Sequence, residues 1–178
     1  MVSILRVLFL AMAVTASPLV ERDVATVKND ITQKIGPQLR KLNNDVNGFP
    51  ESGLVGALAI HSDSVTLVQT LNAATANVKS TGSFDVVAGS TVLTLIQALF
   101  PELHATLVSI SGKVEYFEAV QGGKNLVFAD LKAQNATFSN YLDAIAAAEP
   151  DLLKSGATGI KTLINATYAT IISYYSAD

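Results

Sequence analysis

Apolar residues recur every three or four positions along most of this chain, and that spacing predicts α-helices. Turns that contain Gly or Pro divide the pattern into six segments. The segments cover about residues 20–47, 53–79, 85–99, 101–121, 125–148 and 151–176. Because short loops between long helices favour antiparallel neighbours, we predict an all-α, single-domain antiparallel bundle of about five to six helices.

The first segment has the most regular stripe. Its apolar positions are Val20, Val24, Val27, Ile31, Ile35, Leu39, Leu42 and Val46. Gly36 and Pro37 fall inside the segment, but the stripe continues in phase on both sides of them. This continuity predicts a kink rather than a break.

The second and third segments need more interpretation. In the second, the positions that we assign to the core are Leu54, Ala57, Leu58, Val65, Val68, Leu71 and Val78. The third begins with β-branched residues, which are also typical of strands. The chain has no second strand-like run, so we predict a helix here. Pro101 suits the first turn of a helix, and we expect a new helix to begin there.

Residues 1–16 have the features of a secretory signal peptide. Arg6 precedes a short apolar run, and Val14 and Ala16 are the small residues of a cleavage site. We expect cleavage after Ala16, which leaves a helical domain over residues 17–178 in a secreted, extracellular or wall-associated protein. The remaining chain has no other apolar run of membrane-spanning length without a polar break, so we predict no transmembrane segment.

The composition narrows the class of partner. The chain has 12 basic and 15 acidic residues, and this balance gives no electrostatic attraction for nucleic acid. Cysteine is absent, so no disulfide can form and the fold must be stable through packing. Charged residues make up 15% of the chain, against roughly 25% in a typical soluble domain. The surface is therefore weakly charged for an exported protein.

The stretch AIHSDSV, residues 59 to 65, contains residue types found in hydrolase active sites. A nucleophile, a base and an orienting acid must lie within hydrogen-bond reach of one another. On a helix, Asp63 points about 160° away from His61, so we expect the aspartate on the exposed face. His61 instead lies inside the apolar arc, while Ser62 and Ser64 lie about 100° and 60° from it.

Other patterns of catalysis are also absent from the sequence. It has no G-x-S-x-G elbow, no H-E-x-x-H and no repeated Glu-x-x-His pairs, and His104 forms no zinc pattern with His61. Glu115 and Glu118 are one turn apart, and we assign them to a solvated face. We therefore predict no enzyme, no cofactor and no metal site.

Two polar residues, His61 and Asn135, fall in apolar stripes. Each is either paired internally with a neighbouring helix or lines a cavity that receives the polar head of an apolar ligand. Aromatic residues near them are either ordinary core or the walls of that cavity. The candidate ligand-binding residues are Leu58, His61, Val65, Val68, Phe100, Leu107, Phe117, Phe128, Leu131, Asn135, Phe138, Ile164 and Tyr168.

The chain has two N-glycosylation sequons, at Asn135 and Asn165. Asn165 lies about 100° from the centre of its stripe, so we expect it to accept a glycan. Asn135 faces inward, and we expect it to remain unmodified.

Several stretches, in this order, are similar to a known family. They are DVATVKNDI (23–31), ALAIHSDSV (57–65), LFPELHATL (99–107) and DLKAQNATFSNYLDAIAAAEPDL (130–152), behind a leader and without cysteine. The chain resembles the fungal hydrophobic surface-binding protein A family, which includes antigenic cell-wall galactomannoproteins. The resemblance implies a secreted, non-enzymatic helical bundle that adsorbs to hydrophobic solids and aids recruitment of secreted hydrolases, or encloses fatty acids in its core.

Two functions are consistent with these residues and with the resemblance. The first is binding of hydrophobic matter, either a surface on which helices lay their stripes or a fatty-acid-like lipid inside the bundle. The second is a structural or antigenic wall mannoprotein whose bundle is a scaffold for glycans.

Overall fold

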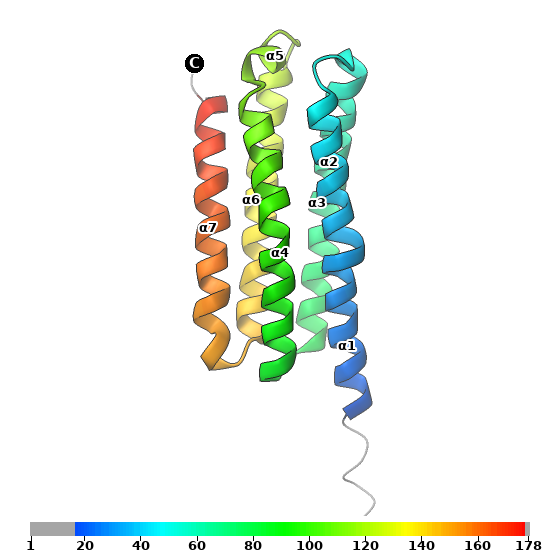
Figure 1. The fold of residues 1–178 in the computed structure, drawn as a ribbon, viewed down its shortest axis with the longest axis vertical. Helices are drawn as coiled ribbons and strands as arrows, with labels where there is room; N and C mark the ends of the chain where they lie inside the picture. The colour runs from blue at the N-terminus through cyan, green and yellow to red at the C-terminus, as the bar shows by residue number, and fades with distance from the viewer. Residues whose placement is uncertain (1–16, 177–178) are drawn as a thin grey trace, which may run out of the picture.

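The protein is an elongated helical bundle, seen in a computed structural model that describes residues 17–176 (Figure 1). The elements in chain order are α1 (Ser17–Asn29), the π-helical turn η2 (Asp30–Ile35), α2 (Gly36–Gly48), α3 (Gly53–Thr81), α4 (Val86–Ser111), α5 (Val114–Glu118), α6 (Gly123–Ala148) and α7 (Asp151–Ser176). The long helices run up and down along the long axis, as predicted. The predicted signal peptide lies outside the described residues.

The first helix is continuous from Ser17 to Gly48, and its predicted stripe is confirmed from Val24 onward, whereas the Val20 side chain lies outside the described ones. Every apolar stripe position from Val24 to Val46 is buried. Near Gly36 and Pro37 the regular α-helix is interrupted by a π-helical turn, which ends immediately before Gly36. Such a turn absorbs the lost backbone hydrogen bond at Pro37 without ending the helix. Gly36 also allows close contact, because a Cβ there would lie 3.2 Å from Leu99 on α4.

The prediction of a new helix at Pro101 is wrong. A single helix, α4, passes through this proline and ends at Ser111. Pro101 has no backbone N–H, so the carbonyl of Gln97 lacks its partner within the helix. Gln97 lies on the exposed side of the helix, where water can form a hydrogen bond with this carbonyl. On the opposite side Ile96, Leu103 and Leu107 are all buried, so core packing keeps the helix continuous. The segment after Gly112 forms only the short helix α5.

The buried face of α3 differs from the predicted one. Ala57, Leu71 and Val78 are buried as expected, and the stripe also contains Ile60 and Leu67. The predicted core positions Leu54, Leu58 and Val65 are exposed instead, and Val68 is half-buried. The reason is that α3 packs between the first helix and α6, and this position turns the side of Asp63 and Ser64 inward.

The last two helices lie over the predicted segments 125–148 and 151–176. On α6 Leu131, Phe138 and Leu142 are buried, while Phe128 is half-buried. On α7 the buried residues are Ala157, Ile160, Ile164, Tyr168, Ile171 and Tyr175. By length and composition alone, α3 and α4 could also cross a membrane. In this bundle both helices contribute side chains to the shared core.

Candidate functional site

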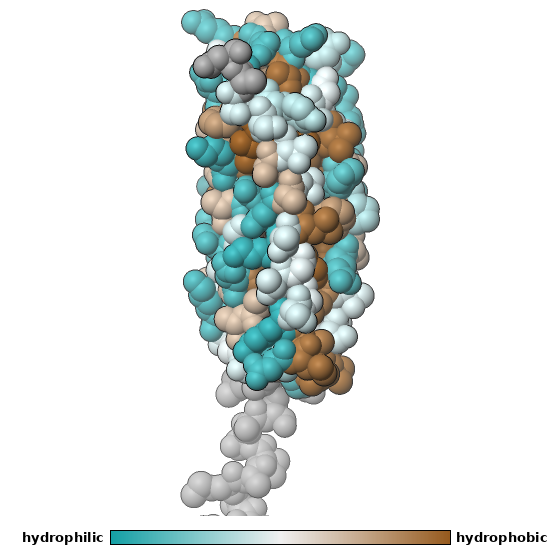
Figure 2. All heavy atoms as spheres, turned by 90° about the vertical axis from the view of Figure 1, so that its left-hand side faces the viewer, coloured by the Kyte–Doolittle hydropathy of each residue, from teal (hydrophilic) through white to brown (hydrophobic). Residues whose placement is uncertain are grey.

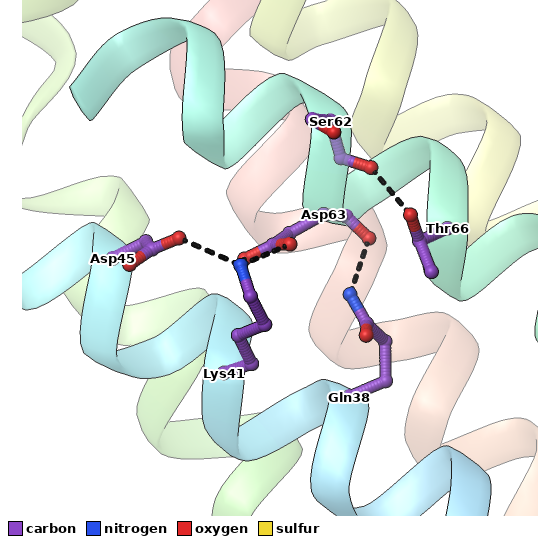
Figure 3. A network of polar contacts seen from close by, with 6 residues as sticks. All are labelled: Gln38, Lys41, Asp45, Ser62, Asp63 and Thr66. Carbon is purple, nitrogen blue, oxygen red and sulfur yellow. Dashed lines mark hydrogen bonds and ion pairs between the residues drawn. The ribbon is translucent and has the colours of Figure 1, made fainter. Parts of the chain in front are cut away.

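The AIHSDSV stretch joins helices and forms no catalytic arrangement. The Asp63 carboxylate is buried and accepts hydrogen bonds of 2.6 and 2.8 Å from Lys41 on α2 (Figure 3). Gln38 donates to the backbone carbonyl of Asp63 at 3.0 Å. Burial raises the pKa of Asp63, and the hydrogen bond from Lys41 opposes that rise. The prediction that Asp63 faces solvent is therefore wrong: it anchors α3 to α2.

His61 is also placed differently from its prediction. Its side chain is 37% exposed and lies at the surface between α3 and α6, rather than in the core. The imidazole Nδ1 lies 3.0 and 3.1 Å from the two carboxylate oxygens of Asp130 on α6. Burial raises the pKa of Asp130, and the contact with His61 lowers it. No pattern along the chain indicated this partner, because the two residues are 69 positions apart.

Beside this pair lies a small apolar cavity of about 100 Å³. It is at the end of the bundle that holds α5 and the α2–α3 turn. Its lining residues are Leu54, Ala57, Leu58, His61, Phe117, Val120, Gln121, Gly122, Gly123, Leu126, Val127 and Asp130. The walls are therefore mainly apolar, and the His61–Asp130 pair stands at one side.

One residue of the cavity lining, Phe117, belongs to an aromatic cluster at this end of the core. Phe117 from α5 stacks on Phe49 with ring centroids 4.5 Å apart, and it also lies 6.3 Å from the ring of Tyr175. The Tyr175 hydroxyl donates to the backbone carbonyl of Ile110 at 2.7 Å. The Lys113 ammonium group donates to the backbone carbonyl of Phe49. These contacts hold the short helix α5 across the end of the bundle.

The candidate residues do not gather at one place. Leu58, His61 and Phe117 line the cavity. The fully buried candidates belong to the packed core: Leu107, Leu131, Phe138, Ile164 and Tyr168. Val65 is exposed, Val68 is half-buried, and neither lines the cavity. Phe100 and Phe128 are half-buried and lie against His104 and Lys132. Four residues of α6 also line the cavity and were not among the predicted ones: Gly123, Leu126, Val127 and Asp130.

Polar residues of the core are mostly paired. The Tyr168 hydroxyl donates to the side-chain carbonyl of Gln134 at 3.0 Å, and both residues are buried. Asn135 is half-buried, and its side-chain oxygen has no partner among the described residues. It lines a surface groove between α6 and α7. Asn165 is half-buried, and its side-chain oxygen accepts a 2.7 Å hydrogen bond from Ser139.

Glu115 and Glu118 lie at the surface of the bundle. Glu115 and Glu118 are both exposed, as predicted, and Glu118 pairs with Lys124 at 2.7 Å. Within residues 17–176, no three His, Asp or Glu side chains are placed to hold a metal ion.

The fold and the cavity together define an all-helical bundle with short loops and an apolar cavity between helices, a common position for ligand sites in bundles. Comparison with known families makes the assignment specific. Residues 24–147 match the family described as hydrophobic surface binding protein A, and the chain belongs to that family.

Several solved structures share the fold. AFMP4P in complex with palmitic acid is 23% identical, with a TM-score of 0.82 over 86% of this chain and 99% of that chain. Ligand binding domain 1 of Penicillium marneffei MP1, complexed with arachidonic acids, is 15% identical, with a TM-score of 0.80 over 88% and 100%. Domain 2 of MP1, complexed with multiple arachidonic acids, is 13% identical, with a TM-score of 0.76 over 89% and 97%. No curated protein matches the chain.

Proposed function

We propose that this protein is a secreted, non-enzymatic protein that binds hydrophobic matter, with a fatty-acid-like lipid as its internal ligand. The observation that carries the proposal is the aliphatic cavity next to the His61–Asp130 pair. Support comes from the family of the chain and from three similar bundles that hold palmitic or arachidonic acid. Adsorption to hydrophobic solids, recruitment of a secreted hydrolase and a location outside the cell or in the wall belong to the same proposal.

The size of the cavity says how the lipid would bind. Ligand sites for small molecules usually have volumes of about 300–1,000 Å³, so a cavity of about 100 Å³ holds only the end of a fatty chain. The rest of the chain must enter as α5 or the neighbouring helices move apart. Burial of about fourteen methylenes contributes about 11 kcal/mol before that cost, which is enough to offset a substantial opening.

The polar rim suits a carboxylic acid at the mouth of this cavity. His61 is partly exposed, so its ring can meet a head group that stays in contact with water. Leu54, Leu58 and Leu126 are exposed beside it, and a bound chain would cover them. In this arrangement the tail enters the bundle first and the head group remains at the rim.

A cavity-filling variant tests the proposal. Ala57 is buried and lines the cavity, so Ala57→Trp should block the opening. Delipidated protein is titrated with a fluorescent fatty acid, and we expect the affinity to fall at least about tenfold, the equivalent of two methylenes. Ala73→Trp, at an exposed position of the same helix, is the control. His61→Leu should lower the affinity if the ring contacts the head group, and an unchanged affinity would give His61 a structural role only.

A second measurement separates lipid binding from the glycan-scaffold alternative. Lipid extraction of protein secreted by its own host should yield a stoichiometric fatty acid, whereas a scaffold should yield none. If the delipidated wild-type protein also fails to bind the fluorescent fatty acid, the internal-ligand proposal is wrong.

A further inference from the structure

The exposed large apolar residues fall into two groups. One group surrounds the cavity and the start of α3. The other follows α4 and α7, and we name it the α4–α7 face: Val86, Val87, Val108, Leu152, Leu163 and Tyr174. Figure 2 shows the molecule from the side of α7, and brown side chains gather along the right-hand edge of this view with paler ones between them.

The α4–α7 face is long because the two helices run side by side along the bundle, in the same direction (Figure 1). Leu93 lies against Gly156 near one end, and the Tyr175 hydroxyl donates to Ile110 near the other. The 22 residue-to-residue steps from Leu152 to Tyr174 span about 33 Å of helix. A groove of about 400 Å³ lies between the helices toward the end with Val108.

Charged groups are nearly absent from this face. Residues 86–101 contain none, and residues 155–176 contain only Lys161. Lys161 turns away from α4 and pairs with Asp143 on α6 at 2.6 Å. Glu102, the one carboxylate of α4, accepts a hydrogen bond of 3.0 Å from Asn43 on α2. Asp151 and Lys154, in the first turn of α7, pair with each other at 2.7 Å. Lys161 and Glu102 therefore point toward other neighbours, and the first turn of α7 is where charge lies nearest to the face.

Outside the core, the threonine hydroxyls of α4 and α7 are also satisfied within their own helices. Six threonines donate to the backbone carbonyl four residues earlier, at 2.8 to 3.0 Å: Thr91, Thr94, Thr158, Thr162, Thr167 and Thr170. A polar group that keeps its hydrogen bond costs little when water is removed, whereas an unpaired one costs several kilocalories per mole. This surface can therefore lose water at low cost.

We propose that the α4–α7 face is the side on which the protein lies against an uncharged hydrophobic solid, with the bundle still closed. The inference rests on the proposed function and assigns a surface to it. An apolar solid offers neither charges nor hydrogen bonds. Adsorption is therefore least costly for a face with few charged groups and few polar groups that depend on hydrogen bonds to water. Specific protein partners instead use aromatic or Arg anchors in pockets together with hydrogen bonds. The internal site for lipid is separate and lies beside α3, α5 and α6.

Paired variants test the assignment with plain polystyrene beads. The double variant Leu152→Glu/Leu163→Glu places charges on two residues that are 77% and 49% exposed, so the fold should be retained. The control Leu54→Glu/Val55→Glu changes two similarly exposed residues of α3. Circular dichroism verifies the helix content of both. We expect adsorption to fall at least about tenfold in the α4–α7 variant and less than about twofold in the control.

In a fatty-acid titration of the same proteins, the affinity should fall in the Leu54→Glu/Val55→Glu variant, because Leu54 lines the cavity, and it should stay unchanged in the Leu152→Glu/Leu163→Glu variant. Equal adsorption of the wild-type protein and both variants would overturn the assignment of the face. So would light scattering that shows a wild-type dimer converted to a monomer by the Leu152/Leu163 changes, since the face would then bind a second copy. Wild-type protein that neither adsorbs nor binds the fatty acid would instead refute the proposed function itself.

Discussion

Glu149 is a buried carboxylic acid with an unusual environment, and it gives the sharpest prediction. It lies between the end of α6 and the start of α7, and it is 3% exposed. Neither carboxyl oxygen has a hydrogen-bond partner among the described residues. The carboxyl group rests against the first turn of α4, where a Cβ at Gly89 would come within 1.9 Å of Oε2. Burial raises the pKa of Glu149 from 4.5 to about 7.

The direction of the pH effect follows from this rise. The folded protein binds the proton more tightly than the unfolded chain, so the stabilisation is fully present below pH 4.5 and is lost as the pH rises through about 7. The pKa values of Glu149 in the unfolded and folded states differ by about 2.5, and at 1.36 kcal/mol for each pKa unit this corresponds to about 3 kcal/mol. Glu149→Gln keeps the shape of the neutral acid and cannot ionise. At pH 9 the variant should be more stable than wild type by about 3 kcal/mol, and at pH 4 the two should be nearly equal.

Urea denaturation at both pH values measures this difference, and thermal denaturation at pH 9 should show it as an increase of roughly 6–12 °C in Tm. Glu115→Gln, at an exposed site of α5, is the matched control and should change stability little at either pH. The same difference between Glu149→Gln and wild type at pH 4 and pH 9 would refute the reasoning, because the carboxyl would then not ionise at a cost inside the fold.

Three further predictions concern packing and buried hydrogen bonds. Gly89→Ala should destabilise the protein by about 1–2 kcal/mol, because the collision with the Glu149 carboxyl outweighs the better helix propensity of alanine. The loss should shrink in a Glu149→Ala background, as a double-mutant cycle in urea would show. Tyr168→Phe should cost about 1–3 kcal/mol, since it leaves its buried amide partner without a donor. Tyr141→Phe should be neutral or stabilising by thermal denaturation, because the Tyr141 hydroxyl is buried and has no partner among the described residues; a loss larger than that of Tyr168→Phe would contradict this account.

The fold agrees with what the periodicity predicted, and the family match agrees with the resemblance of the quoted stretches. Particular elements show where the periodicity was sufficient. The stripe of the first helix was predicted correctly from Val24 to Val46, because this helix has one buried side with apolar residues at every turn. Such a stripe defines both the helix and its orientation. On α3 the same reasoning was wrong about Leu54, Leu58 and Val65, since apolar residues occur around most of that helix and the stripe alone cannot choose a side.

The amino-acid sequence by itself therefore determined where most helices lie and that they pack as a bundle. Because it contains no cysteine, it also determined that packing rather than disulfides holds the helices together. Only the tertiary structure decided that Asp63 is buried against Lys41 and that His61 meets Asp130 at the mouth of a cavity. It also decided that α4 continues through Pro101, because buried side chains on both sides of the proline hold the helix together. Helical periodicity is a property of neighbours in sequence, whereas these pairings depend on how distant helices are rotated against one another, and packing of the whole core sets that rotation.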